Sequence, residues 1–228
     1  MIFPVVAWPH ELLRTPAIRV ITLSEDIRAL GGSLLDTIRA AGGASLCAQQ
    51  TQAPYRVFAV RAGLDTDGAD DIDTDDGAMV SITAGVDRLD GLVCVNPELV
   101  SLDGKPHLVA EGCLSFPSVA VQVKRAPKVT IKYVGLDGRE HRLSCGGLMA
   151  QAIQHELEHL DGRLLFDHAG PAKRKSMRRQ FPATKGRVYD WSPGKALEPE
   201  HAVAYAEATQ IVPATVPPWE RPKLQVVR

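Results

Sequence analysis

The stretch Gln154-His155-Glu156-Leu157-Glu158-His159 contains the pattern H-E-x-x-H. On a helix, two histidines four residues apart project from the same face, so both imidazoles can bind one metal ion. Glu156 then lies beside the ion without being a ligand. A surface helix with two unrelated histidines is the alternative, but two unpaired imidazoles in a buried helix would be costly. The apolar residues that mark this helix as buried are Leu148, Ala152, Leu157 and Leu160.

A catalytic centre of the zinc type needs three protein ligands and an open position for water, so the third ligand must come from elsewhere in the chain. Asp161, Asp167 and His168 follow the helix. Upstream, Cys113 lies within the run Glu111-Gly112-Cys113-Leu114-Ser115-Phe116-Pro117. Spacing alone does not choose among these four residues.

The N-terminal side of the motif predicts one helix followed by strands. Ser24 is placed to cap an amphipathic helix, which Gly42-Gly43 would end. Its apolar positions, three or four residues apart, are Ile27, Leu30, Leu34 and Ile38. The β-rich segments that follow are 55–60, 92–95, 119–123, 129–134 and 141–143. The last two are joined by the turn residues Asp137-Gly138, which indicates antiparallel pairing.

The final helix is expected to begin after Gly146-Gly147 and to run to Leu160, with Gly162 placed to end it. The order of helix, strands and helix predicts an α+β fold in which antiparallel strands pack around a central metal-binding helix, with a further helix near the N-terminus.

Composition narrows the class of protein. A chain of 228 residues with a net charge of -1 can form a single domain and carries no broad basic surface for nucleic acid. We therefore expect no specific DNA binding. The first eight residues lack a basic secretory signal and no apolar run approaches the roughly 20 residues that span a bilayer, so we expect a cytoplasmic protein without membrane contact. Its four cysteines are irregularly spaced, which indicates reduced thiols.

Two segments stand apart from this pattern. The aspartate-rich stretch 65–76 suggests calcium, but its spacing does not fit an EF-hand loop, so we interpret it as a solvated insertion. Beyond about Gly170 a basic run, 173–179, precedes a proline-containing tail, which we expect to pack little. The basic run either contacts ribosomal RNA or forms a solvated helix face, and we favour the second interpretation.

The two central motifs together resemble those of the peptide deformylases: Glu111-Gly112-Cys113-Leu114-Ser115 and Gln154-His155-Glu156-Leu157-Glu158-His159. The resemblance extends upstream to Trp8-Pro9 and 13–16, and it covers roughly residues 8–167. It implies a catalytic domain over residues 1–170, with 171–228 as a C-terminal extension. It also implies that Cys113, His155 and His159 bind a divalent metal, ferrous iron by preference, with nickel, cobalt or zinc as substitutes.

The family's first motif, a glycine-rich run ending in glutamine, corresponds to residues 43–50. Gly43 and Gln50 match it, whereas Ser45 replaces a glycine and Gln49 replaces a proline. By this resemblance Gly43 and Ser45 belong to the substrate site, and the Ser45 side chain would narrow the cleft. Without the other two motifs, an ordinary loop between helix and strand would be the preferred interpretation.

The resemblance implies hydrolysis of the formyl group from formyl-methionine at the N-terminus of nascent polypeptides. Glu156 would be the general base, and the Leu114 backbone amide and the Gln50 side chain would stabilise the developing oxyanion. Glu111 and Arg125 are candidates to support the imidazoles, although a structural ion pair is the preferred interpretation of each. The other cysteines, which we assign to packing, are Cys47, Cys94 and Cys145.

Three other functions remain as alternatives. A specialised deformylase could act on another N-formyl compound. A catalytically silent metal-binding protein could serve as a ribosome- or partner-binding module, but the chain retains every residue that the chemistry needs. A general endopeptidase sharing only the helix motif would leave the Cys113 segment unexplained.

Overall fold

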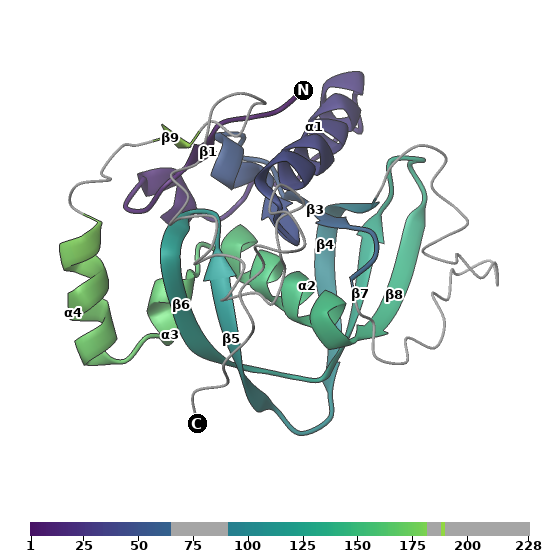
Figure 1. Ribbon diagram of the computed structural model, residues 1–228. Coiled ribbons are helices and arrows are strands. Elements are labelled where there is room, and N and C mark those ends of the chain that lie inside the picture. The colour runs from purple at the N-terminus through teal and green to yellow at the C-terminus, as the bar shows by residue number, and fades with distance from the viewer. Residues whose placement is uncertain (65–90, 182–187, 190–228) are drawn as a thin grey trace, which may run out of the picture.

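The computed structural model describes residues 1–64, 91–181 and 188–189 (Figure 1). The aspartate-rich stretch 65–76 and most of the tail lie outside the described residues. The elements in chain order are β1 (Val5–Val6), η1 (Glu11–Arg14), α1 (Glu25–Ala41), β2 (Ser45–Cys47), η2 (Ala48–Thr51), β3 (Val57–Arg61), β4 (Gly91–Asp103), β5 (His107–Cys113), β6 (Phe116–Arg125), β7 (Lys128–Val134), β8 (Glu140–Gly146), α2 (Gly147–Leu160), α3 (Leu165–His168), α4 (Pro171–Gln180) and β9 (Val188–Tyr189).

Helix α1 begins and ends where the sequence predicts. The Ser24 hydroxyl accepts a hydrogen bond from the Ile27 backbone N–H, which satisfies one of the free donors of the first turn. Gly42 ends the helix in the left-handed conformation, with φ of 66°, and its N–H caps the last carbonyls. The buried face of α1 packs on β2 and β3 and covers one side of the sheet.

The strands form a five-stranded antiparallel sheet in the order β2-β3-β4-β7-β8, and β5 and β6 form a separate antiparallel pair. The expected strands are confirmed, including the β7–β8 hairpin, where Tyr133 pairs with His141. The sequence prediction missed the short strands β1, β2 and β9, and also β5. Two of these contribute to the functional site, β2 through Ser45 and β5 through Cys113.

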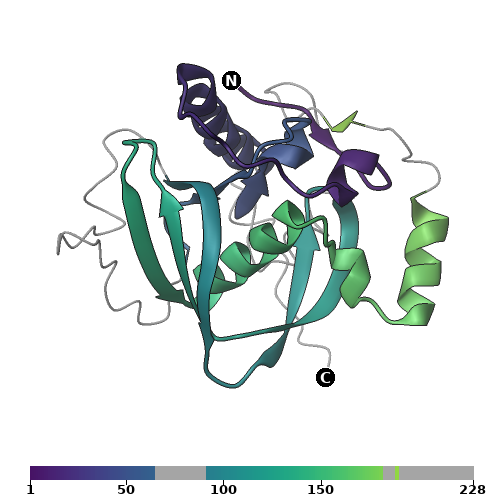
Figure 2. The ribbon, with the colours of Figure 1, turned by 180° about the vertical axis from the view of Figure 1, so that it is seen from behind.

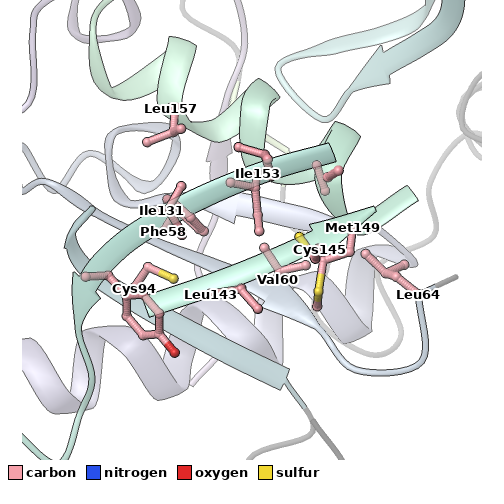
Figure 3. Packing of buried hydrophobic residues seen from close by; sticks show 14 of the residues in the cluster. Phe58, Val60, Leu64, Cys94, Ile131, Leu143, Cys145, Met149, Ile153 and Leu157 are labelled. Carbon is pink, nitrogen blue, oxygen red and sulfur yellow. The ribbon is translucent and has the colours of Figure 1, made fainter. Parts of the chain in front are cut away.

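Helix α2 runs between the five-stranded sheet and the β5–β6 pair, as both views of the molecule show (Figures 1 and 2). One face of the helix is apolar: Met149, Ile153 and Leu157 belong to the same buried cluster as Phe58 and Ile131 of the sheet (Figure 3). Burying such side chains contributes roughly 1.5–3 kcal/mol each. This packing fixes the position of the helix that carries the two histidines, and it confirms the predicted α+β arrangement.

The basic run forms the solvated helix face that the sequence favours, since α4 exposes most of its cations, but the expectation that the chain beyond this run packs little is wrong for Phe181. Met177 and Phe181 are buried in one cluster with Phe116 and Phe166, because the otherwise basic helix turns its apolar side toward the protein. Strand β9 also pairs with β1. Within the described part of the chain, no helix combines the length and the apolar character that crossing a membrane requires.

Candidate metal centre

The end of β5 and the centre of α2 bring three metal-binding side chains together. The donor atoms of Cys113, His155 and His159 all lie within 4.8 Å of one another. The distance from Cys113 Sγ to His159 Nε2 is 3.2 Å. A sulfur and a nitrogen that lie roughly 2.3 and 2.0 Å from one tetrahedral ion are separated by about 3.5 Å. The three side chains therefore fit a divalent metal, as the resemblance implied.

His155 has the orientation that this role requires, and His159 has the protonation state that it requires. His155 Nδ1 lies 3.0 Å from Glu111 Oε2, which leaves Nε2 for the metal side and fixes the orientation of the ring. Burial would lower the pKa of His155, but its hydrogen bonds with Cys113 and Glu111 raise that pKa well above its usual value. Burial instead lowers the pKa of His159 far below its usual value, so this ring is neutral, as a ligand must be.

Glu111 and Arg125 both support the centre and form an ion pair with each other. Arg125 Nε and Nη2 donate to the two Glu111 carboxylate oxygens at 2.6 and 2.8 Å, and its Nη1 lies 3.0 Å from Glu158 Oε1. Burial opposes ionisation of Glu111, yet hydrogen bonds with Arg125 and His155 lower its pKa to about 2. A buried anion therefore faces His155, and Arg125 compensates its charge. Glu158 Oε2 in turn lies 2.8 Å from His168 Nε2.

The other three candidates for the third ligand are engaged elsewhere. Asp161 accepts a hydrogen bond from Arg56 at 2.7 Å, and Asp167 pairs with Arg14 at 2.5 Å. His168 pairs with Glu158. The described residues therefore leave Cys113 as the partner of the two histidines, a choice that spacing alone could not make.

A pocket opens beside these ligands and includes most of the predicted site residues. Its lining is made of Ala44, Ser45, Gln50, Ala110, Glu111, Gly112, Cys113, Leu114, Leu148, Gln151, Ala152, His155 and Glu156. Gly43 is not among the lining residues, and its N–H donates to the Ile38 carbonyl of α1 at 3.0 Å. Of the two residues expected at the substrate site, Ser45 alone lines the pocket.

Glu156 is buried beside the ligands and has one unengaged oxygen. Its Oε1 accepts a hydrogen bond from Ser45 Oγ at 2.6 Å, whereas Oε2 has no hydrogen-bond partner among the described residues. Burial raises the pKa of this carboxyl group. The carboxylate is thus able to hold a proton at the pocket, which is what a proton-transfer residue needs.

Gln50 is held in place by the segment that precedes it. Its Oε1 accepts a hydrogen bond from the Cys47 backbone N–H at 2.9 Å, and its Nε2 donates to Ser115 Oγ at 3.1 Å. The same Nε2 also donates to Cys113 Sγ at 3.5 Å, so both hydrogens of this amide point to partners beside the metal ligands. Leu114, the second predicted oxyanion residue, lines the same pocket.

The unexpected Gln49 has a structural explanation. Its side-chain amide donates to the backbone carbonyls of Thr15 and, at 3.4 Å, Leu12. These bonds tie η2 to the N-terminal segment rather than to the pocket. The three assigned cysteines also pack as predicted, because Cys47, Cys94 and Cys145 are all free and buried in one apolar cluster.

The sequence analysis missed several lining residues as parts of the site. Leu148, Gln151 and Ala152 precede His155 at helical spacing and line the pocket from α2. That spacing was a usable signal, because residues three and four positions before a ligand share its face of a helix. For Ala110 and Gly112, the sequence gives no indication of a place in the pocket except that they lie close to Cys113 in the chain.

Comparisons with known proteins agree on one family. The family model for polypeptide deformylase matches residues 2–175. A peptide deformylase of Rhodopseudomonas palustris is 30% identical over 191 residues, which are 84% of this chain and 96% of the relative. A peptide deformylase of a Wolbachia species is 33% identical over 75% of this chain and 89% of its own length.

Solved structures give the same result for the fold. The crystal structure of a peptide deformylase from Legionella pneumophila matches with a TM-score of 0.66 and 32% identity, and the match covers 81% of this chain and 96% of the other. A peptide deformylase from Ehrlichia chaffeensis, crystallised with actinonin, is only 21% identical but matches with a TM-score of 0.68 over 82% and 99% of the two chains. The fold is thus retained at low sequence identity.

Proposed function

Because the chain belongs to the polypeptide deformylase family, we propose that Cys113, His155 and His159 hold one divalent metal ion and that Glu156 moves the proton in hydrolysis of N-formyl-methionyl peptides. The enzyme is a hydrolase that removes the N-formyl group from nascent polypeptides. The observation that carries the assignment of residues is that the three clustered ligands adjoin a pocket lined by a buried carboxylate, Glu156, which has one unengaged oxygen.

The donor set favours a metal of intermediate softness. One sulfur and two imidazole nitrogens suit iron(II), and also zinc, cobalt and nickel. We propose iron(II) as the native ion, on the family resemblance together with this donor set. When bound, the ion supplies Lewis acidity, which lowers the pKa of water and polarises a carbonyl group.

The residues of the chain account for the remaining requirements of the reaction. Glu156 takes the proton of the attacking water and returns it to the departing amine, as its free oxygen allows. The Gln50 side-chain amide and the Leu114 backbone amide stabilise the negative charge that develops on the former formyl oxygen. Glu111 and Arg125 keep the His155 ring in its ligand orientation. The products are formate and a free N-terminal amine.

We expect the metal-loaded protein to release formate from the peptide formyl-Met-Ala-Ser, but no acetate from acetyl-Met-Ala-Ser. The comparison isolates the formyl group, because the two peptides differ by one methyl group. The measurement is enzymatic detection of formate and acetate after anaerobic reconstitution with iron(II), followed by the same assay with a chelator. Absence of formate from protein with its full complement of iron would overturn the peptide substrate and favour a specialised deformylase acting on another N-formyl compound.

The C-terminal extension is the natural place for a transient ribosome contact. We divide the chain into a catalytic domain, 1–170, and an extension, 171–228, whose first helix is α4. This helix exposes Lys173, Lys175 and Arg179, while Arg174 and Arg178 lie over the Phe166 ring at 5.7 and 5.3 Å. Exposed cations near a nascent-chain enzyme can bind ribosomal RNA phosphates. A substrate that emerges from the ribosome also supports a cytoplasmic location.

Reversing the charge of Lys173, Lys175 and Arg179 to glutamate should weaken ribosome binding by at least about 10-fold, because three phosphate contacts would be lost. Co-sedimentation with purified ribosomes at two salt concentrations measures this effect. The matched control reverses the charge of three exposed lysines away from α4: Lys105 between β4 and β5, Lys124 on β6 and Lys128 on β7. Equal binding by the two triple variants would contradict a contact through α4.

A further inference from the structure

The Ser45 hydroxyl donates a hydrogen bond to the Glu156 carboxylate, and the two residues lie 111 positions apart in the chain. Its Oγ donates to Glu156 Oε1 at 2.6 Å. Hydrogen bonds from a hydroxyl to an ionised oxygen are short, roughly 2.5–2.7 Å, and about twice as strong as neutral ones. The contact therefore has the geometry of a charge-assisted bond.

Both partners are attached to rigid elements. Ser45 belongs to β2 and pairs with Val60 of β3, so its backbone is fixed by the sheet. Glu156 belongs to α2, which packs on the same sheet through its apolar face. A glutamate side chain has three rotatable bonds, and a strong contact at its end removes much of the freedom that these bonds allow. The Ser45 hydroxyl thus restricts where the carboxylate can lie.

We infer that Ser45 is a positioning residue for Glu156: its hydroxyl holds one carboxylate oxygen against β2, so that the other is presented for proton transfer. This inference rests on the proposed function of Glu156. It assigns a role to a side chain at a position where the family's first motif has glycine, so the chain achieves this orientation with a group of its own.

A second role for Ser45 would give a different signature. Ser45 also lines the pocket, so its side chain could act only by narrowing the space for substrate. Narrowing depends on the volume of the side chain and alters KM. Positioning depends on the hydroxyl and alters kcat, because it changes the transfer of a proton and not the binding of the peptide.

The test compares Ser45→Ala, Ser45→Gly and Ser45→Thr in steady-state formate release by iron-loaded protein. Alanine and glycine should lower kcat by about 10-fold with KM changed less than about 2-fold, because misplacement of a reacting group mainly affects the chemical step. Threonine retains the hydroxyl and should restore kcat to within about 3-fold of the parent. In the Glu156→Gln background, Ser45→Ala should add less than about 2-fold, because residues that act as a unit are not additive.

The matched control is Ser101→Ala, because the Ser101 hydroxyl also donates to a carboxylate, Asp103 Oδ2 at 2.7 Å, but at the exposed end of β4. It should leave kcat and KM unchanged. Thermal unfolding and iron content of every variant show that the folded, loaded enzyme is being compared. If alanine matches the parent, or if KM follows side-chain volume while kcat stays constant, positioning is refuted. A parent that releases no formate refutes the proposed function instead, so the two failures are distinguishable.

Discussion

Glu156→Gln should lower kcat for formate release by roughly 100- to 10,000-fold, the range that a well-placed general acid–base residue contributes. Glutamine has almost the shape of glutamate but cannot take a proton from water. The Ser45 hydroxyl can still donate to the amide oxygen of the new side chain. The variant should therefore fold, keep its metal and bind peptide, yet lose the chemical step.

Three measurements separate this result from simple damage to the centre. Iron content should remain stoichiometric, the Tm should stay close to that of the parent, and KM should change little. The control is Glu140→Gln, which removes an exposed carboxylate at the start of β8, outside the pocket lining, and should retain full activity. A Glu156→Gln enzyme that keeps its iron and turns over at the parental rate would show that another group carries the proton.

The parts of the fold that were predictable from sequence are those with strong local signals. Helix α1 has a capping serine, a regular apolar stripe and a terminal glycine, and each of these acts over a few residues. Helix α2 has the H-E-x-x-H spacing and a clear apolar face. The short strand β2 has no such signal, because it has three residues and its pairing with β3 depends on the rest of the sheet. Its assignment to a loop was a reasonable interpretation of local sequence alone.

Helix α4 is largely exposed, but it is anchored to the protein by an apolar contact that its composition does not reveal. A run of cations with one methionine has the composition of a solvated helix. In the folded protein, however, Met177 and the following Phe181 are buried, and Arg174 and Arg178 lie over the Phe166 ring. The long stems of arginine can cover an apolar surface while the charged ends stay in water. This packing is visible only in the structure, where α3 places the Phe166 ring against the arginines of α4.

The candidate site, like the fold, was predictable where the signal is local and not where it depends on contacts between distant residues. The two histidines follow from helical spacing, and Cys113 was one of four candidates until the family resemblance selected it. Its proximity to His159 depends on where β5 ends against α2, a contact between residues 46 positions apart. The hydrogen bond between Ser45 and Glu156 likewise joins residues that are distant in the sequence. Sequence identified both residues separately, but only the packing of α2 against the sheet brings them into contact.

The second large effect is expected for Cys113→Ala, which should abolish stable metal binding. Losing even an outer partner of a ligand typically costs roughly 10- to 100-fold in metal affinity, and losing the sulfur ligand itself should cost more. Only the two histidines then remain, whereas a catalytic centre of this type needs three protein ligands. Formate release should then fall with metal occupancy, and added iron(II) should no longer raise the Tm, since a ligand stabilises a protein only by binding its folded state.

Cys145→Ala is the matched control, because Cys145 is equally buried but packs in the apolar cluster away from the ligands. Both substitutions remove a buried sulfur, so both should lower stability through lost packing, by a similar amount in the absence of metal. Only Cys113→Ala should also remove the increase in Tm that iron(II) gives. Metal content after desalting and the Tm with and without iron(II) measure this difference. If the Cys113 variant retained stoichiometric iron, the ion would have to be held by a donor other than this sulfur, and the three-residue centre would be wrong.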